Sequence, residues 1–257
     1  MPPPVVRGPS ARSLLSIEWD YPVYKPEKKE TKGSVARSVR RALSREDALK
    51  VIAGDDPRPL LVLRECKVCN GTDEALLKGG VDNEKTFLLA RWFHCVKLPV
   101  DVMEENHPFH NLFTLEQPEH LFVSSLDGEN HDPLESDTSR VALWESMKGV
   151  IKDEYKGKAD SSLKKIAKTL DKMDVVDERL REAKASRDEI LEKEGPKSRK
   201  LGKIEKQIAK YETEAEKLHA TVAKASALEL KRQHEALREK NAKERADKAA
   251  KKDAAGV

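Results

Sequence analysis

The feature that most restricts the fold is a heptad pattern in the C-terminal part of the chain. From about Asp160 onward Lys, Glu, Ala and Leu dominate, and apolar residues recur at alternating spacings of three and four. Gly195 and Pro196 divide this pattern into two stretches. Residues 158–257 are therefore predicted to form an all-α coiled coil, an antiparallel helical hairpin whose helices of about 35 residues reach about 50 Å. The predicted seam positions are Leu163, Ile166, Leu170, Met173, Val176, Leu180, Ala183, Arg187, Ile190, Leu201, Ile204, Ile208, Tyr211, Ala215, Leu218, Val222 and Ala225.

The same apolar stripe has a second interpretation, which is self-association of two chains through the seam. The basic tail that follows it, residues 231–257, carries 9 basic and 5 acidic side chains. Such a tail could contact nucleic acid or an acidic protein surface. Its interspersed acids and its lack of stacking aromatic residues argue against specific nucleic-acid recognition, and a solvated helix end is favoured.

The core-forming residues are concentrated ahead of this pattern. The whole chain of 257 residues is 37% charged with a net charge of +3, but residues 43–150 carry 11 basic and 20 acidic side chains. All three cysteines lie in this acidic segment, and no Trp or Phe follows residue 157. We expect a globular domain over residues 41–157. Residues 1–40 are rich in Pro, Ser, Lys and Arg and predict a mostly disordered arm, with one apolar knot at residues 14–19 that either docks on the domain or stays unstructured.

The acidic segment alternates between strand and helix signals. Ser44 is a candidate N-cap for a short helix, and the apolar run at residues 60–63 predicts a strand that is covered on both faces. Helices are expected at 72–77 and 82–90, strands at 93–98 and 121–123, a turn at 126–129 and a final helix from Ser139 to about Tyr155. This alternation predicts an α/β domain.

A C-x-x-C pair, Cys66 and Cys69, directly follows the first predicted strand. Two intervening residues let the sulfur atoms reach bonding distance in a turn or a first helical turn, where a helix N-terminus stabilises a thiolate. In a reducing compartment a close pair indicates redox chemistry or metal binding rather than a structural disulfide. Lys67 adds a positive charge that favours the thiolate, whereas Glu65 should oppose its formation.

Three landmarks make residues 41–157 resemble the thioredoxin-like fold family: the C-x-x-C after an apolar strand, Pro118 before the strand at 121–123, and the Asp127-Gly128-Glu129 turn. The resemblance implies that Cys66 is the attacking nucleophile and Cys69 the resolving thiol. It also implies that Pro118 is a cis proline that faces the pair. Leu60 stands where the family keeps a buried acid, a departure that concerns catalytic efficiency more than the fold.

Two other interpretations of the cysteine pair remain open. A thioredoxin-like domain can retain both cysteines without turning over a substrate. Zinc binding by Cys66, Cys69, His94 and Cys95 would supply four ligands, but adjacent residues of a strand point to opposite faces, and Cys95 is most simply a buried core residue.

The sequence gives little support to a membrane-spanning, secreted, hydrolytic or nucleotide-dependent protein. It has no run of about 18 apolar residues, no secretory pattern, no glycine-rich phosphate loop and no Ser-His-Asp or His-Glu-x-x-His pattern. The four histidines His107, His110, His120 and His131 lie in acidic or loop-like surroundings. The sequence thus predicts a cytoplasmic thiol–disulfide oxidoreductase without a cofactor or a metal, acting on protein thiols, whose coiled coil binds a partner. The alternative is a non-catalytic interaction protein built on the same fold.

Overall fold

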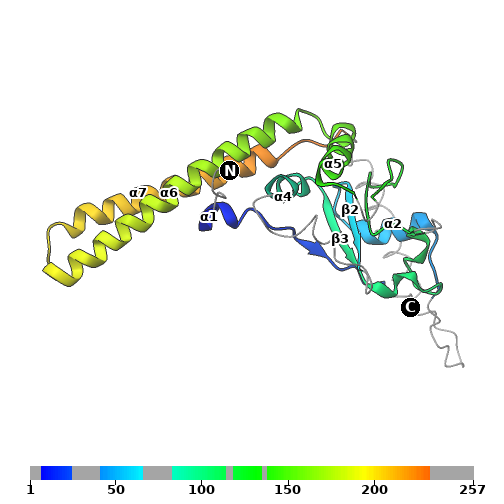
Figure 1. Ribbon diagram of the computed structural model, residues 1–257, viewed down its shortest axis with the longest axis horizontal. Coiled ribbons are helices and arrows are strands. Elements are labelled where there is room, and N and C mark those ends of the chain that lie inside the picture. The colour runs from blue at the N-terminus through cyan, green and yellow to red at the C-terminus, as the bar shows by residue number, and fades with distance from the viewer. Residues whose placement is uncertain (1–6, 25–40, 66–82, 114–117, 135–137, 232–257) are drawn as a thin grey trace, which may run out of the picture.

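The computed structural model describes residues 7–24, 41–65, 83–113, 118–134 and 138–231. These residues form a head with a mixed sheet and a long helical hairpin that projects from it (Figure 1). The elements, in chain order, are α1 (Pro9–Arg12), β1 (Trp19–Asp20), α2 (Arg45–Ala53), β2 (Leu60–Arg64), α4 (Glu84–Ala90), β3 (His94–Leu98), the 3-10 helices η2 (Val100–Met103) and η3 (His110–Leu112), β4 (Leu121–Ser124), β5 (Asp132–Leu134), α5 (Arg140–Glu154), α6 (Ala159–Glu194) and α7 (Leu201–Ser226).

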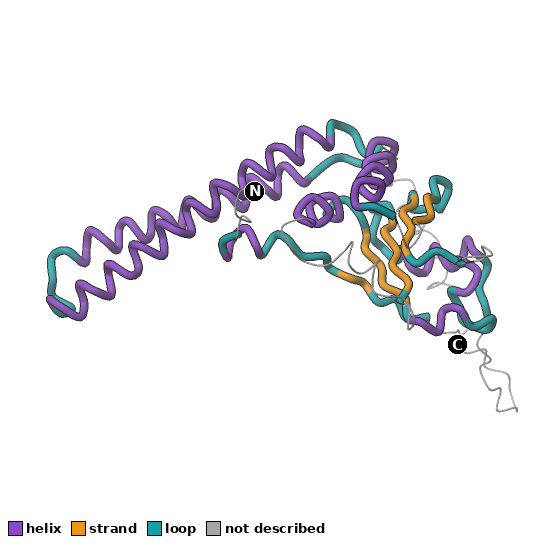
Figure 2. Tube along the Cα trace, viewed as in Figure 1, coloured by secondary structure: helices purple, strands orange, loops and turns teal. Residues whose placement is uncertain are grey.

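The sheet of the head has the strand order β1-β3-β2-β4-β5 (Figure 2). Strands β1, β3 and β2 run parallel, and β4 is antiparallel to both β2 and β5. Leu61 of the central strand β2 lies opposite Cys95 on one side and Val123 on the other. All five residues of β2 are buried, as the apolar run predicts. The helix-covered mixed sheet confirms the predicted α/β class.

Each face of the sheet carries its own hydrophobic cluster. One face packs on α2 and the segment around η3, through Ile52, Val62 and Phe122. The other face packs on α4 and α5, through Leu61, Leu89 and Met147. Alternate residues of β2 therefore serve opposite clusters, as the strand period requires.

Local signals place two of the covering helices, α2 and α5, as predicted. The Ser44 hydroxyl accepts a hydrogen bond from the Asp47 backbone N–H at 3.1 Å, and the Ser139 hydroxyl accepts one from the Ala142 N–H at 3.2 Å. Both are N-caps that satisfy an otherwise unpaired donor of the first turn. The turn predicted at 126–129 has Gly128 at φ +78°, and a Cβ added there would lie 2.5 Å from Leu49 Cδ1. The positive φ favours glycine at this position, and any larger residue would also displace the end of the Leu49 side chain.

The helices α6 and α7 form the predicted antiparallel hairpin. Gly195 ends α6 with φ +75°, a left-handed backbone that favours glycine, and the chain then turns into α7. None of the predicted seam positions, all of which are described, is exposed. An exposed ion pair between Lys184 Nζ and Glu212 Oε1 at 3.4 Å links the two helices. The seam residues thus pair within one chain.

The base of the hairpin shares the hydrophobic cluster of the head. Ile166, Leu170 and Met173 of α6 and Val222 of α7 are fully buried in the cluster that contains Leu61 and Met147. The Trp92 indole donates to the Ser226 carbonyl at 2.8 Å, which ties the end of α7 to the head. The core that sequence analysis assigns to residues 41–157 therefore continues into the helices beyond residue 158.

The N-terminal segment differs from the predicted disordered arm. Its described part, residues 7–24, forms α1 and the edge strand β1, and the apolar knot at residues 14–19 packs against the core shared by head and hairpin. Arg7 donates to Glu84 of α4 at 2.7 Å and to Asp171 and Asp174 of α6 at 2.7 Å each. The segment is ordered because its apolar and charged residues bind at the junction of head and hairpin. The remaining residues up to 40 lie outside the described ranges.

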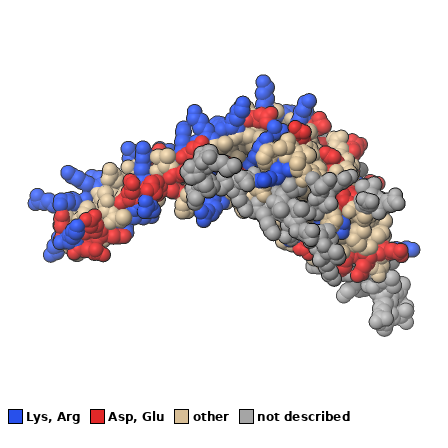
Figure 3. All heavy atoms as spheres, viewed as in Figure 1, with Lys and Arg blue, Asp and Glu red and all other residues tan. Residues whose placement is uncertain are grey.

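Three further observations concern membrane-spanning helices, the surface charge of the hairpin and the basic tail. Within the described residues, no helix is long and apolar enough to cross a membrane. Along the hairpin, Lys and Arg side chains alternate with Asp and Glu on the visible face (Figure 3). Of the basic tail expected over 231–257, only Lys231 is described.

Candidate active site

The candidate site lies at the carboxyl end of β2, where the C-x-x-C pair follows in the sequence. Cys66 and Cys69 themselves are outside the described residues. Glu65, which immediately precedes Cys66, is described and donates its backbone N–H to the Leu98 carbonyl at 2.9 Å. The strand pairing with β3 thus continues to the residue next to the predicted nucleophile.

Pro118 lies at this same end of β2. The Arg64 guanidinium donates through Nη2 to the Pro118 carbonyl at 3.0 Å and through Nε to the Glu119 carbonyl at 3.1 Å. The Arg64 backbone N–H also donates to the His120 carbonyl at 2.7 Å. Pro118 therefore lies beside Arg64 at the end of β2, while the cysteine pair that it was expected to face lies outside the described residues. The peptide bond that precedes Pro118 involves Gln117, which is outside the described residues.

Arg64 is a site residue that sequence analysis did not identify. Its side chain is buried, and its guanidinium carbon lies 5.6 Å from the centre of the Phe113 ring. A guanidinium is always charged, so Arg64 brings a positive charge to the end of β2. The only signal in the sequence was a cation at the end of an otherwise apolar strand.

The charge of Glu65 is compensated across the sheet. Its carboxylate forms an ion pair with Lys97 of β3, at 3.0 Å between Oε1 and Nζ. Sequence analysis expected Glu65 to oppose ionisation of Cys66. Because the Lys97 ammonium offsets that negative charge, the opposition is weaker than a lone carboxylate would exert.

A buried acid–histidine pair follows Pro118 directly in the chain. Glu119 Oε1 lies 2.8 Å from His131 Nε2, and the Glu119 side chain is only 3% exposed. Burial alone would raise the pKa of Glu119, but the hydrogen bond to His131 and a backbone hydrogen bond hold that pKa below its usual value. The His131 ring packs at 4.6 Å from the Phe122 ring. His131 thus supports the loop that carries Pro118, a role its loop-like surroundings did not indicate.

The residues proposed as the second half of a zinc site lie elsewhere. His94 and Cys95 begin β3, opposite Leu60 and Leu61, whereas Glu65 pairs beyond its end. At about 3.3 Å per residue, the two ends are more than 10 Å apart. His94 Nε2 lies 3.2 Å from Asp20 Oδ2, while burial raises the pKa of the Cys95 thiol to about 12. Among the described residues no group of three or more His, Cys, Asp or Glu side chains could hold a metal ion.

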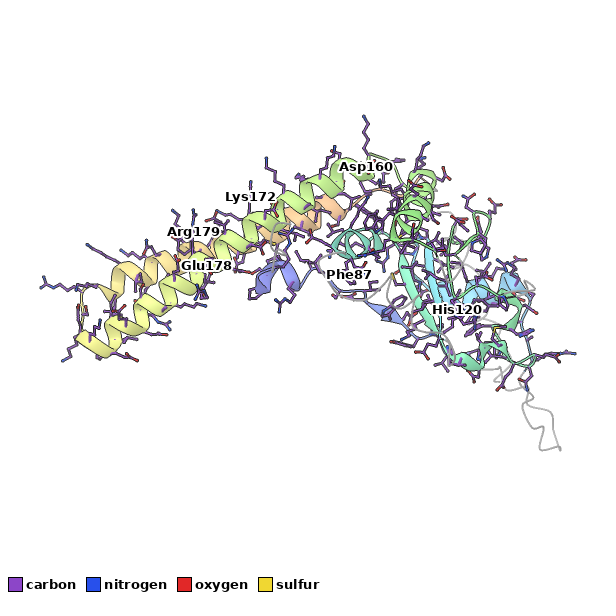
Figure 4. All side chains as sticks on the ribbon, in the orientation of Figure 1. Phe87, His120, Asp160, Lys172, Glu178 and Arg179 are labelled. Carbon is purple, nitrogen blue, oxygen red and sulfur yellow. The ribbon has the colours of Figure 1, made fainter. Side chains whose placement is uncertain are left out.

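The candidate site and the hairpin base occupy opposite ends of the strands. Figure 4 shows His120 at the end of the sheet that lies away from Asp160, where α6 begins. Arg64, at the carboxyl end of β2, donates a hydrogen bond to the Pro118 carbonyl. Trp92, two residues before the start of β3, donates one to Ser226 of α7. A partner that touches both the hairpin and the site must therefore span at least the length of β2, about 17 Å.

Comparisons with known proteins do not assign a family or a function to this chain. No family model, curated protein or solved structure matches this chain.

Proposed function

We propose that this chain is a thiol–disulfide oxidoreductase of thioredoxin-like type that acts on protein thiols through Cys66 and Cys69. The observation that carries the proposal is the hydrogen bond from Arg64 to the Pro118 carbonyl, because Arg64 ends the strand that leads into the pair. The strand order, with three parallel strands followed by two antiparallel ones, agrees with the thioredoxin-like arrangement. So does the placement of α2 on one face of the sheet and of α4 and α5 on the other.

In the direction of substrate reduction, the proposed exchange has two steps. The Cys66 thiolate attacks one sulfur of a protein disulfide, forming a mixed disulfide and releasing the other sulfur as a thiolate, which takes up a proton. The Cys69 thiol then loses its proton, and the resulting thiolate attacks the Cys66 sulfur and releases the second substrate sulfur as a thiolate, which takes up a proton. The substrate gains two electrons, and the chain keeps a Cys66–Cys69 disulfide. In the opposite direction the same steps oxidise a substrate dithiol.

Positive charge at the end of β2 supports nucleophile formation. Arg64 is fixed there by two carbonyl groups, and Lys97 offsets Glu65. Lys67 of the pair itself adds a further cation. Cations near a thiol lower its pKa and raise the fraction of thiolate at neutral pH.

A trapping experiment tests the proposal. In a Cys69→Ser variant the resolving thiol is absent, so a mixed disulfide between Cys66 and a substrate should persist. We expect covalent complexes that dissociate on reduction, and none with the Cys66→Ser, Cys69→Ser double variant. Recovery of the same complexes with the double variant, or no complex with a disulfide-bonded substrate protein, would contradict the proposal.

A non-catalytic interaction protein is the second candidate. It is favoured by the continuous core of head and hairpin, which presents the hairpin on a fixed support. In that case partner capture should survive replacement of both cysteines by serine. Under the redox proposal, a captured partner stays bound on dilution only when Cys66 is present, because the link is a mixed disulfide.

A further inference from the structure

A pocket of about 310 Å³ lies where three distant segments of the chain meet, at the opposite end of the sheet from the candidate active site. The N-terminal segment contributes residues 13, 14 and 16–18, and the head contributes Arg58 and the junction between α4 and β3. Ser226, the last residue of α7, completes the wall. The volume is at the lower end of the range for small-molecule sites.

Arg91 is the charged group of this pocket with spare hydrogen-bonding capacity. Its Nε donates to the Ser226 hydroxyl at 3.1 Å, and its Nη1 donates to the Leu14 carbonyl at 3.4 Å. Both acceptors are neutral, and a guanidinium has five N–H donors. No carboxylate in the described part of the chain lies within ion-pair distance of Arg91. Burial lowers the pKa of Arg91 and the nearby Arg58 lowers it further, while Glu18 offsets part of this effect.

The second arginine of the pocket is already neutralised. Arg58 donates to Asp56 through Nε at 3.0 Å and through Nη2 at 2.6 Å, and its Nη1 donates to the Arg91 carbonyl at 3.2 Å. Glu18 also lines the pocket, but its side chain is exposed. The pocket therefore holds one half-buried positive charge that lacks a bonded counter-charge among the described residues.

We propose that this pocket binds the carboxylate of a small organic acid, with Arg91 as the residue that recognises it. A carboxylate has one negative charge and two oxygens that match the fork of a guanidinium. Leu14, Ile17 and Phe93 line the same pocket and provide apolar surface for the rest of the acid. One cation without a bonded counter-charge among the described residues matches a monoanion better than a phosphate dianion.

Binding at this pocket would fasten the hairpin to the head. The wall includes Ser226 of α7, Leu14 of the N-terminal segment and Arg91 of the head. A ligand that contacts all three segments stabilises their association by mass action. Amide hydrogen exchange in the last turn of α7 and in residues 14–18 should slow when the acid is bound.

Calorimetric titration of the full chain at low ionic strength tests the proposal. The probes are benzoate and hexanoate, with benzamide and hexanamide as uncharged controls of the same shape. We expect saturable binding of at least one acid with a Kd of about 1 mM or tighter, and none of either amide. The Arg91→Gln variant should weaken binding about tenfold or more, because a charge-assisted pair is lost.

Two further variants keep the test decisive if Arg91→Gln loses stability. Ser16→Glu adds an acid at an exposed position of the pocket wall, so it should weaken binding without disturbing the core. Arg181→Gln removes an exposed arginine of α6 that lies outside the wall and should bind as the unmodified chain does. Equal binding of acids and amides, no saturation by either acid at about 20 mM, or full binding by Ser16→Glu would overturn the proposal.

Discussion

The two ends of the hairpin follow the same heptad pattern but have different surroundings. At the base, Leu170 and Met173 of α6 are fully buried in a cluster with Trp92 and Met147 of the head. Towards the tip, the seam residue Leu201 is buried and Ile190 is half-buried, while Leu191, which lies outside the predicted seam, is 38% exposed. Within the described residues, the helices at the tip lie against each other and away from the head (Figure 1), whereas those at the base also pack on the head.

This difference shows that periodicity predicts a seam but not the number of partners that cover it. Two helices alone bury a narrow stripe, and most helical stability in proteins comes from tertiary packing. The base gains that packing from α4 and α5. Arg7 of the N-terminal segment adds ion pairs with Glu84 of α4 and Asp174 of α6. We therefore expect the base to be part of the head's folding unit and the tip to be dispensable for it.

The largest expected effect follows from removing the hairpin. Deletion of residues 159–231 exposes the cluster shared by the head and the helices, so the remaining chain should lose cooperative thermal unfolding and bind hydrophobic dyes. Calorimetry and circular dichroism measure this. Excision of only the tip is the matched control: residues 185–211 are replaced by about four Gly and Ser residues that join Lys184 to Glu212, which already face each other. That variant should unfold cooperatively, and a stable isolated head would refute the shared core.

Two leucines of α6 provide a smaller-scale comparison. Leu170→Ala, at the base, should lower the free energy of unfolding by about 2–5 kcal/mol, because it leaves a cavity in a fully buried site. Leu191→Ala, near the tip, removes a side chain that is 38% exposed and should cost about 0.5 kcal/mol or less. Urea titration measures both changes, and equal losses would contradict the distinction between base and tip.

Loss of an arginine should likewise cost more stability at the base of the hairpin than further along α6. Arg7→Met keeps an aliphatic stem but removes the bonds to Glu84 and Asp174, whose side chains are 19% and 23% exposed. We expect a loss of about 2 kcal/mol. Arg181→Met removes an exposed pair with Glu178 and should leave unfolding unchanged within error. If high salt abolished the effect of Arg7→Met, the Arg7 ion pairs would be screened surface contacts, and the prediction would be contradicted.

The smallest expected effect is a pH dependence at the base. Burial raises the pKa of Glu154, and Asp153 raises it further. The folded-state pKa of Glu154 lies above its unfolded value of about 4.3. Ionisation of Glu154 therefore lowers the free energy of unfolding as the pH rises from the unfolded pKa to the folded one. Glu154→Gln should therefore be slightly more stable than the unmodified chain at pH 7 and equal to it near pH 4. Glu192→Gln, at an exposed position near the tip, should track the unmodified chain at both pH values in thermal melts.

Most of the fold could be predicted from local patterns. The N-caps Ser44 and Ser139, the apolar run of β2 and the hairpin seam each have a local physical cause that a sequence displays. Strand β1 could not be predicted, because two residues carry no periodicity and Trp19 pairs with Cys95, far along the chain. The packing of the hairpin base was also hidden: Thr169 lies outside the predicted seam and is nevertheless only 5% exposed.

Only part of the candidate site could be anticipated from the sequence. The resemblance to the thioredoxin-like family implied that Pro118 faces Cys66 and Cys69, and the described residues place Pro118 beside Arg64 at the end of β2. The compensation of Glu65 by Lys97 and the pairing of Glu119 with His131 depend on strand register and loop course. Those contacts join residues that no short-range pattern connects, so the sequence could suggest the residue types but not the partners.

The most direct test of the proposed chemistry is a redox titration with site-resolved alkylation. The full chain is equilibrated in reduced and oxidised glutathione buffers, quenched with an alkylating reagent and analysed by mass spectrometry. We predict that Cys66 and Cys69 lose reactivity together in one two-electron transition, while Cys95, 3% exposed with its pKa raised to about 12, stays unmodified at every potential. Alkylation of Cys66 and Cys69 that is independent of the buffer potential would contradict the account.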